Sequence, residues 1–235
     1  LGLFTCRESF GSDASSLFNV ITGYSRPPEY QHFIVAPHGM RSFFVYMIRQ
    51  EIENAKKGLP SGITVKVNSL VDPELIELLY EASQAGVQIK MIVRGICCLI
   101  PGIEGVSENI TVISIVGQLL EHSRIFRFEN AGNPRIYMGS ADWMPRNLDR
   151  RVELVFPIED EKQKARAFSI LDTMLSDTTN ARYMQSDTSY VHVDLRGKQK
   201  ISSQLTFYRE AQERLKALQA IEKDSVLIPI HSADE

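Results

Sequence analysis

Strand-like and helical segments alternate through the first part of this chain, and that alternation limits the folds it can adopt. Apolar, strand-like stretches at residues 32–36, 63–67 and 87–93 are separated by helical spacing at 43–57 and 73–84. Helices between strands favour right-handed crossovers and a parallel sheet. Further strands are predicted at 110–115 and 151–156, and further helices at 159–175 and 199–222. The sequence predicts an α/β fold with a mixed, mostly parallel sheet flanked by helices.

A β-hairpin is predicted at residues 123–138. Polar and apolar residues alternate from Ser123 to Phe128, and Asn, Gly and Pro follow at residues 130–134, a pattern typical of two strands joined by a turn. His122 and Arg124 then lie on one face at the mouth of a strand. An imidazole can attack phosphorus or protonate a leaving group while a guanidinium holds phosphate oxygens, so the pair indicates phosphoryl transfer. The alternative is a histidine that simply binds a backbone carbonyl.

Composition sets broad limits. The chain has 235 residues, of which 43% are hydrophobic, so it can bury one substantial core, and its net charge of -3 does not favour nucleic acid as a partner. Its three cysteines, two of them adjacent, suit a reducing compartment and give no zinc-like spacing, so we expect no metal ligands here. No apolar run approaches the ~20 residues of a membrane span. We expect a cytoplasmic protein, with peripheral membrane association left open.

Polar residues end two of the predicted parallel strands. Asn68 and Ser69 follow the strand at 63–67, and Arg94 follows the strand at 87–93. The carboxyl ends of parallel strands are where α/β sheets bind ligands. Asn68 and Ser69 could donate to phosphate oxygens or cap the following helix, although Asp72 is the expected cap.

Arginine is concentrated around the hairpin. Residues 124–151 hold six arginines against three acidic residues, a local excess of +3. Such a cluster is often a solvated face, but a long polyanion needs a path lined by cations. Arg124, Arg146 and Arg151 are the candidates for that lining.

Two resemblances extend these observations. The hairpin resembles the half-site of the phospholipase D superfamily, with Arg124 in place of lysine, Glu129 in place of aspartate and residues 139–142 as the closing turn. Over about residues 1–215 the chain more closely resembles the C-terminal part of polyphosphate kinases of the first family. The matching stretches, in the family's order, are residues 58–64 (GLPSGIT), 66–72 (KVNSLVD), 93–102 (VRGICCLIPG), 121–124 (EHSR) and 140–147 (SADWMPRN).

The second resemblance implies a phospholipase D-like domain at residues 29–222, preceded at 1–28 by the tail of another catalytic domain and followed at 223–235 by a flexible tail. It implies reversible phosphate transfer between ATP or ADP and inorganic polyphosphate, through a phosphohistidine on a preceding domain. His122 then serves as acid/base or electrostatic support, and Arg94 binds nucleotide phosphate. Mg²⁺ ligands are expected outside this chain, which we read as a fragment that is inactive alone and belongs to a homo-oligomer.

Two alternatives stay open. The chain could be half of a phospholipase D-type phosphodiesterase in which His122 is the nucleophile. It could also be a non-catalytic polyanion-binding or dimerisation module.

Overall fold

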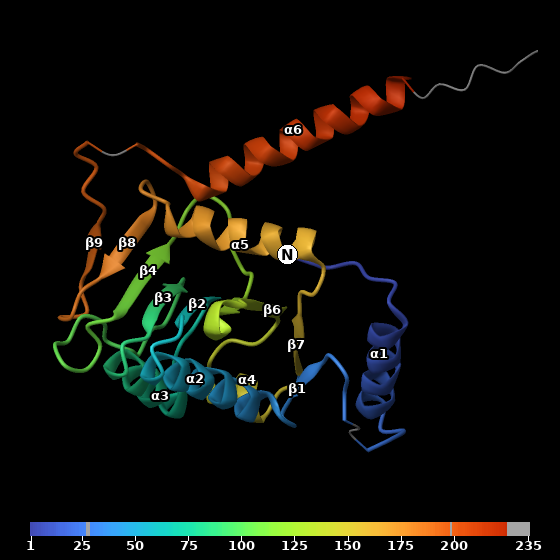
Figure 1. The fold of residues 1–235 in the computed structure, drawn as a ribbon. Coiled ribbons are helices and arrows are strands. Elements are labelled where there is room, and N and C mark those ends of the chain that lie inside the picture. Colours follow the sequence, from blue (N-terminus) through green and yellow to red (C-terminus); the bar gives the residue numbers. More distant parts are fainter. Residues whose placement is uncertain (27–28, 198, 225–235) are drawn as a thin grey trace, which may run out of the picture.

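One β-sheet with helices on both faces forms the body of the molecule in the computed structural model, which describes residues 1–26, 29–197 and 199–224 (Figure 1). The elements in chain order are α1 (Glu8–Ile21), β1 (Ile34–Ala36), α2 (Met40–Lys56), β2 (Gly62–Val67), α3 (Pro73–Gln84), β3 (Gln88–Val93), β4 (Ile110–Ile115), β5 (Ile125–Phe128), the 3-10 turn η1 (Asn130–Gly132), β6 (Arg135–Gly139), α4 (Pro145–Asp149), β7 (Glu153–Pro157), α5 (Glu161–Leu175), β8 (Ala181–Met184), β9 (Tyr190–His192) and α6 (Ser203–Asp224).

The sheet is mixed, and its strand order is β1-β7-β6-β5-β2-β3-β4-β8-β9. Only the β2–β3 and β3–β4 pairings are parallel, while the other six pairings between described strands are antiparallel. The α/β class and the flanking helices are therefore confirmed, but the prediction of a mostly parallel sheet is wrong. The reason is that β5, β6 and β7 follow one another in antiparallel pairs, and β8 and β9 extend the other side of the sheet in the same way. In addition, β1 pairs with β7 at the far edge instead of with β2, so the helix α2 does not link neighbouring strands.

Capping side chains set where two helices begin. The Asp72 carboxylate accepts the Leu75 amide at 3.1 Å, and Pro73 occupies the first turn of α3. Asp160 accepts the Gln163 amide at 3.0 Å at the start of α5. The expected capping role of Asp72 is confirmed, so Asn68 and Ser69 do not cap this helix.

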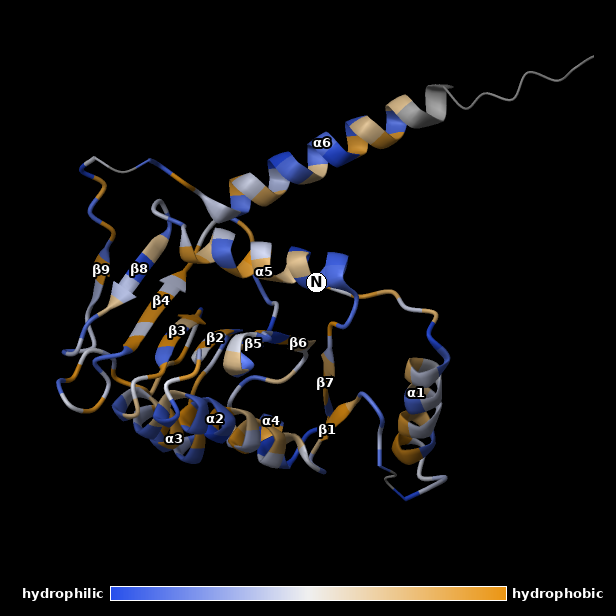
Figure 2. Cartoon of the chain, in the orientation of Figure 1, coloured by the Kyte–Doolittle hydropathy of each residue, from blue (hydrophilic) through white to orange (hydrophobic). Residues whose placement is uncertain are grey.

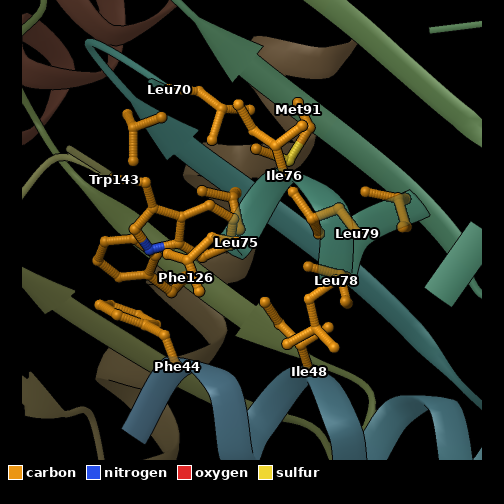
Figure 3. Close-up of a cluster of buried hydrophobic side chains, with 14 of the residues drawn as sticks. Phe44, Ile48, Leu70, Leu75, Ile76, Leu78, Leu79, Met91, Phe126 and Trp143 are labelled. Carbon is orange, nitrogen blue, oxygen red and sulfur yellow. The ribbon is translucent and has the colours of Figure 1, made fainter. Parts of the chain in front are cut away.

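Two hydrophobic clusters hold the layers together. One lies between the sheet and α2 and α3, and includes Phe44, Phe126 and Trp143, all fully buried (Figure 3). The Trp143 ring lies 5.3 Å from Phe44 and 5.8 Å from Phe126, measured between centroids. The other cluster lies under α5. The central strands are correspondingly hydrophobic and the helices amphipathic (Figure 2). Trp143 is thus a central residue of the first cluster.

Four elements were not predicted, namely α1, α4, β8 and β9. α1 forms within residues 1–24, which show no regular period; its Asp13 accepts the amides of Gln31, His32 and Phe33 at 3.0, 2.7 and 3.0 Å. The short strands β8 and β9 extend the sheet beyond the set that the sequence predicted.

At the other end of the chain, the predicted tail at 223–235 lies outside the described residues apart from the last residues of α6. Among the described helices none is long and apolar enough to cross a bilayer.

Candidate functional site

Four chain segments meet at one edge of the sheet. β2 and β3 run parallel, so Asn68 and Arg94 follow them at the same edge. β5 pairs antiparallel with β2, with Ile125 opposite Lys66, so the residues just before β5 reach this edge as well. β6 is antiparallel to β5. At the end of β6, the backbone amide of Gly139 donates to the carbonyl of Arg124 at 3.3 Å. Registry alone therefore gathers residues 68, 94, 122–124 and 139–142.

Arg94 contacts His122 at this edge. Its Nε donates to Asn68 Oδ1 at 2.9 Å, and its Nη2 lies 3.3 Å from His122 Nδ1. Because arginine has only donors, Nδ1 must be the acceptor, which places the ring proton on Nε2. Neither amino hydrogen on Nη1 of Arg94 has a partner among the described residues. The structure thus brings together three residues that the sequence singled out, Asn68, Arg94 and His122.

The environment of His122 disfavours its charged form. Loss of solvation, together with the nearby cations Arg124 and Arg94, holds the pKa of His122 below its usual range. The side chain is nevertheless exposed. At neutral pH the free site therefore presents a neutral imidazole with its Nε2 hydrogen available to a ligand.

Arg124 is engaged by a carboxylate. Its Nε and Nη2 donate to Asp142 at 3.2 and 3.0 Å, and its Nη1 donates to the carbonyl of His122 at 2.9 Å. Asp142 also accepts the Asn68 amide at 2.7 Å. The guanidinium fork that the sequence assigned to phosphate thus faces Asp142 in this structure. Two of its five donors remain, so Arg124 holds His122 in place and can still offer charge to an anion.

Lys66 lies beneath this cluster and was missed by sequence reasoning. It is 1% exposed, and its Nζ donates to the carbonyl of Ser123 at 3.0 Å. Burial lowers the pKa of Lys66 to about 8, although Glu121 works against that shift. Glu121 in turn accepts the Ser123 amide at 2.8 Å. A charged residue within an otherwise apolar central strand was the available signal.

Lys66 gives a prediction about stability and pH. The unfolded lysine titrates near pH ~10.4, so between pH ~8 and ~10.4 the unfolded state binds more protons than the folded one. The free energy of unfolding of the wild type, relative to Lys66→Met, should therefore rise with pH in that window, by at most about 1.4 kcal/mol per pH unit. Urea unfolding of both proteins across this range measures the difference. A constant difference would show that Lys66 keeps its proton in the folded state.

The other predicted site residues lie farther out. Ser69 is half-buried beside Gly95, where a Cβ would approach Asn68 O at 2.9 Å, so only glycine allows this close passage. Arg151 is exposed and lies 3.8 Å from Glu153, which also binds Ser140 and Asn147. Arg146 is exposed on α4, and its side chain makes no hydrogen bond or ion pair with any described residue. The structure therefore does not bring Arg146 or Arg151 into contact with His122.

Two hollows adjoin the Arg94–His122 contact. One, of about 380 Å³, is lined by His122, Arg124 and Ser140. The other, of about 480 Å³, is lined by Arg94 and by residues of β4, β8 and β9. Within the part of the chain that the structure describes, no group of three or more His, Cys, Asp or Glu side chains could hold a metal ion. The expectation that the Mg²⁺ ligands lie outside this chain stays a prediction.

Fold and site together define a mixed-sheet α/β domain that carries a histidine and two arginines at one edge. Residues 33–204 match the family described as "Polyphosphate kinase C-terminal domain 2". The polyphosphate kinases of Lactiplantibacillus plantarum and Synechocystis sp. are 50% and 56% identical to this chain over 92% and 81% of its length. The crystal structure of polyphosphate kinase from Porphyromonas gingivalis superposes with a TM-score of 0.86 at 34% identity, over 91% of this chain. The chain therefore belongs to the polyphosphate kinase family.

The chain is much shorter than these relatives. The matched region spans 30% of the Lactiplantibacillus plantarum protein, 26% of the Synechocystis protein and 33% of the Porphyromonas gingivalis structure. The resemblance stated from the five sequence stretches is confirmed at the level of the family. The roles of the individual residues stay predictions.

Proposed function

We propose that this chain is the C-terminal part of an enzyme that reversibly transfers the terminal phosphate of ATP to inorganic polyphosphate. Family membership supports the reaction class. The observation that carries the proposal is the contact of Arg94 Nη2 with His122 Nδ1 at an exposed sheet edge. It joins a permanent cation to a neutral imidazole whose remaining N–H is free, a pairing suited to a phosphoryl group in transfer.

The ring proton of His122 distinguishes between two roles. A histidine that attacks phosphorus through Nε2 needs a lone pair there, with the proton on Nδ1. Here Nδ1 accepts from Arg94, so Nε2 carries the hydrogen, and the neutral ring donates a hydrogen bond from Nε2 to a phosphate oxygen. This arrangement supports His122 as acid/base or electrostatic support, and it speaks against the phosphodiesterase alternative in which His122 is the nucleophile.

The surrounding residues act mainly through this pair. Arg94 offers its Nη1 hydrogens to phosphate oxygens, and Asn68 fixes the Arg94 side chain from Nε. Asp142 holds both Asn68 and Arg124, so the cluster keeps its shape before substrate arrives. An anionic substrate favours the protonated form of His122. Both ring nitrogens are then donors, so Nδ1 gives up its hydrogen bond from Arg94 and the ring can act as a general acid.

The phosphohistidine that the reaction requires is proposed to lie on a preceding domain, together with the groups that hold Mg²⁺. This chain alone, incubated with labelled ATP and Mg²⁺, should form neither polyphosphate nor an acid-labile phosphoprotein. A chimera in which it replaces the matching region of the Lactiplantibacillus plantarum enzyme, to which it is 50% identical, should synthesise polyphosphate.

The two proteins test different parts of the proposal. Robust synthesis by the isolated chain would contradict the supporting role of His122, because the nucleophile would then lie in this chain. An inactive but folded chimera would instead favour a non-catalytic module.

A further inference from the structure

We propose that Ser114, Arg182 and His192 form a row of hydrogen-bond donors, with the Arg182 guanidinium as its permanent charge, and that this row binds the polyphosphate chain beyond the phosphates at Arg94 and His122. This inference rests on the proposed function and extends it to residues that sequence reasoning did not reach. The row lines the hollow of about 480 Å³ that also includes Arg94. Its members come from β4, β8 and β9, the last two of which were not predicted.

Sheet registry aligns the row. Ser114 pairs with Arg182, and Arg182 pairs with His192. Residues directly opposite one another in adjacent strands point to the same face, so the three side chains lie side by side across three strands. At the end of the row nearest β3, Ser114 Oγ donates to the carbonyl of Arg94 at 3.2 Å. Strands lie about 4.8 Å apart, so the three steps from β3 to β9 extend about 14 Å from Arg94.

The Arg182 and His192 side chains of the row are free to bind an anion. The Arg182 guanidinium and the His192 ring make no hydrogen bond or ion pair with any described residue, and both are exposed. No carboxylate lines this hollow within the described part of the chain. Most other arginines near the site, such as Arg41 and Arg124, are bound by carboxylates. Arg182 lacks a carboxylate partner and lines the same hollow as Arg94, so the two positive charges favour a bound anion there.

The shape of the row selects the ligand. Its donors are spread over about 14 Å instead of converging on one point, which suits a linear anion with a charge on every unit. The nucleoside of ATP is neutral, so it gains little from a contact with the Arg182 guanidinium. The ligand that matches is a linear polyphosphate running from the Arg94–His122 contact toward β9, with ATP reaching only the first part of that path.

The experiment compares ligands of different length on the 235-residue chain. Arg182→Ala and the double variant Arg182→Ala/His192→Ala should weaken binding of long-chain polyphosphate roughly tenfold, because each removes charge-assisted contacts. Binding of tripolyphosphate and ATP should change less than about twofold. Arg94→Ala should weaken all three ligands. Arg209→Ala provides a matched control, since Arg209 is an exposed arginine on α6 without a described partner. Titration calorimetry at low salt measures the affinities.

The outcomes separate the two proposals. If Arg94→Ala weakens every ligand but Arg182→Ala and Arg209→Ala behave alike, the phosphate site stands and the row is overturned. If Arg182→Ala weakens ATP as much as long polyphosphate, the hollow is a nucleotide site and the row is again overturned. If Arg94→Ala has no effect on any ligand, the proposed phosphate site itself fails. Circular dichroism confirms that each variant is folded.

Discussion

Replacing His122 by alanine should lower the turnover of the active chimera by about 100-fold or more, since general acid–base groups typically contribute 10²–10⁴. The side chain is exposed and makes its described contact through Nδ1, so its removal should leave folding intact. The KM for ATP should change much less than kcat, because a contact made in the transition state contributes little to ground-state binding. Steady-state kinetics and the melting temperature of the variant test both statements.

Substitutions that mimic single ring nitrogens sharpen this test. His122→Gln places an amide N–H near the position of Nε2, so it can retain hydrogen bonding but cannot transfer a proton. His122→Asn places an acceptor near Nδ1 for Arg94 but lacks the outer donor. Recovery of turnover in the glutamine variant alone would assign His122 to hydrogen-bond support, and failure of both would assign it to proton transfer.

A histidine elsewhere supplies the control. His38 is exposed and has no described partner, so His38→Ala should leave kcat unchanged. Near-normal turnover of His122→Ala combined with a lowered melting temperature would show that His122 is a structural residue, and the proposal for this site would be wrong.

The sequence predicted the edge at which the site forms, for a simple reason. Asn68 and Arg94 each follow a parallel strand, and parallel neighbours end at the same edge. The hairpin then returned His122 to that edge because β5 pairs with β2. Local patterns, namely alternation and turn residues, predicted the strands and the hairpin, whereas the pairing of β5 with β2 was not predicted. Such patterns are the features that a single sequence reveals most readily.

The same local patterns could not predict which residues far apart in the sequence pair with one another. Which carboxylate faces Arg124 depends on how the β6 end packs, and Asp142 was predicted only as part of a closing turn. The protonation pattern of His122 depends on Arg94, 28 residues away in sequence. β8 and β9 are only 4 and 3 residues long, too short to show a clear period. The excess of antiparallel pairing has the same origin, because it depends on the unpredicted strands β8 and β9 and on the partners of β1 and β5, which local patterns do not reveal.

Asp142→Ala should lower the free energy of unfolding by about 3–5 kcal/mol, the range found when one partner of a buried ion pair is removed. The Asp142 and Arg124 side chains are only 10% and 13% exposed, so water cannot readily replace the lost carboxylate. The variant also leaves the Asn68 amide without its acceptor at 2.7 Å. Urea unfolding of the 235-residue chain measures the loss.

Two further variants separate charge from hydrogen bonding. Asp142→Asn keeps an oxygen for the Asn68 amide and removes the charge, so its loss should be smaller, about 1–3 kcal/mol. Glu161→Ala removes the ion-pair partner of Lys164. The Glu161 side chain is 84% exposed, so this change should alter the free energy of unfolding by no more than about 0.5 kcal/mol. If Asp142→Ala cost no more than Glu161→Ala, the carboxylate would not be holding the site together. A large loss would mean that one buried carboxylate fixes Arg124 directly and Arg94 through Asn68, so that His122 owes its position to a residue that need not touch the substrate.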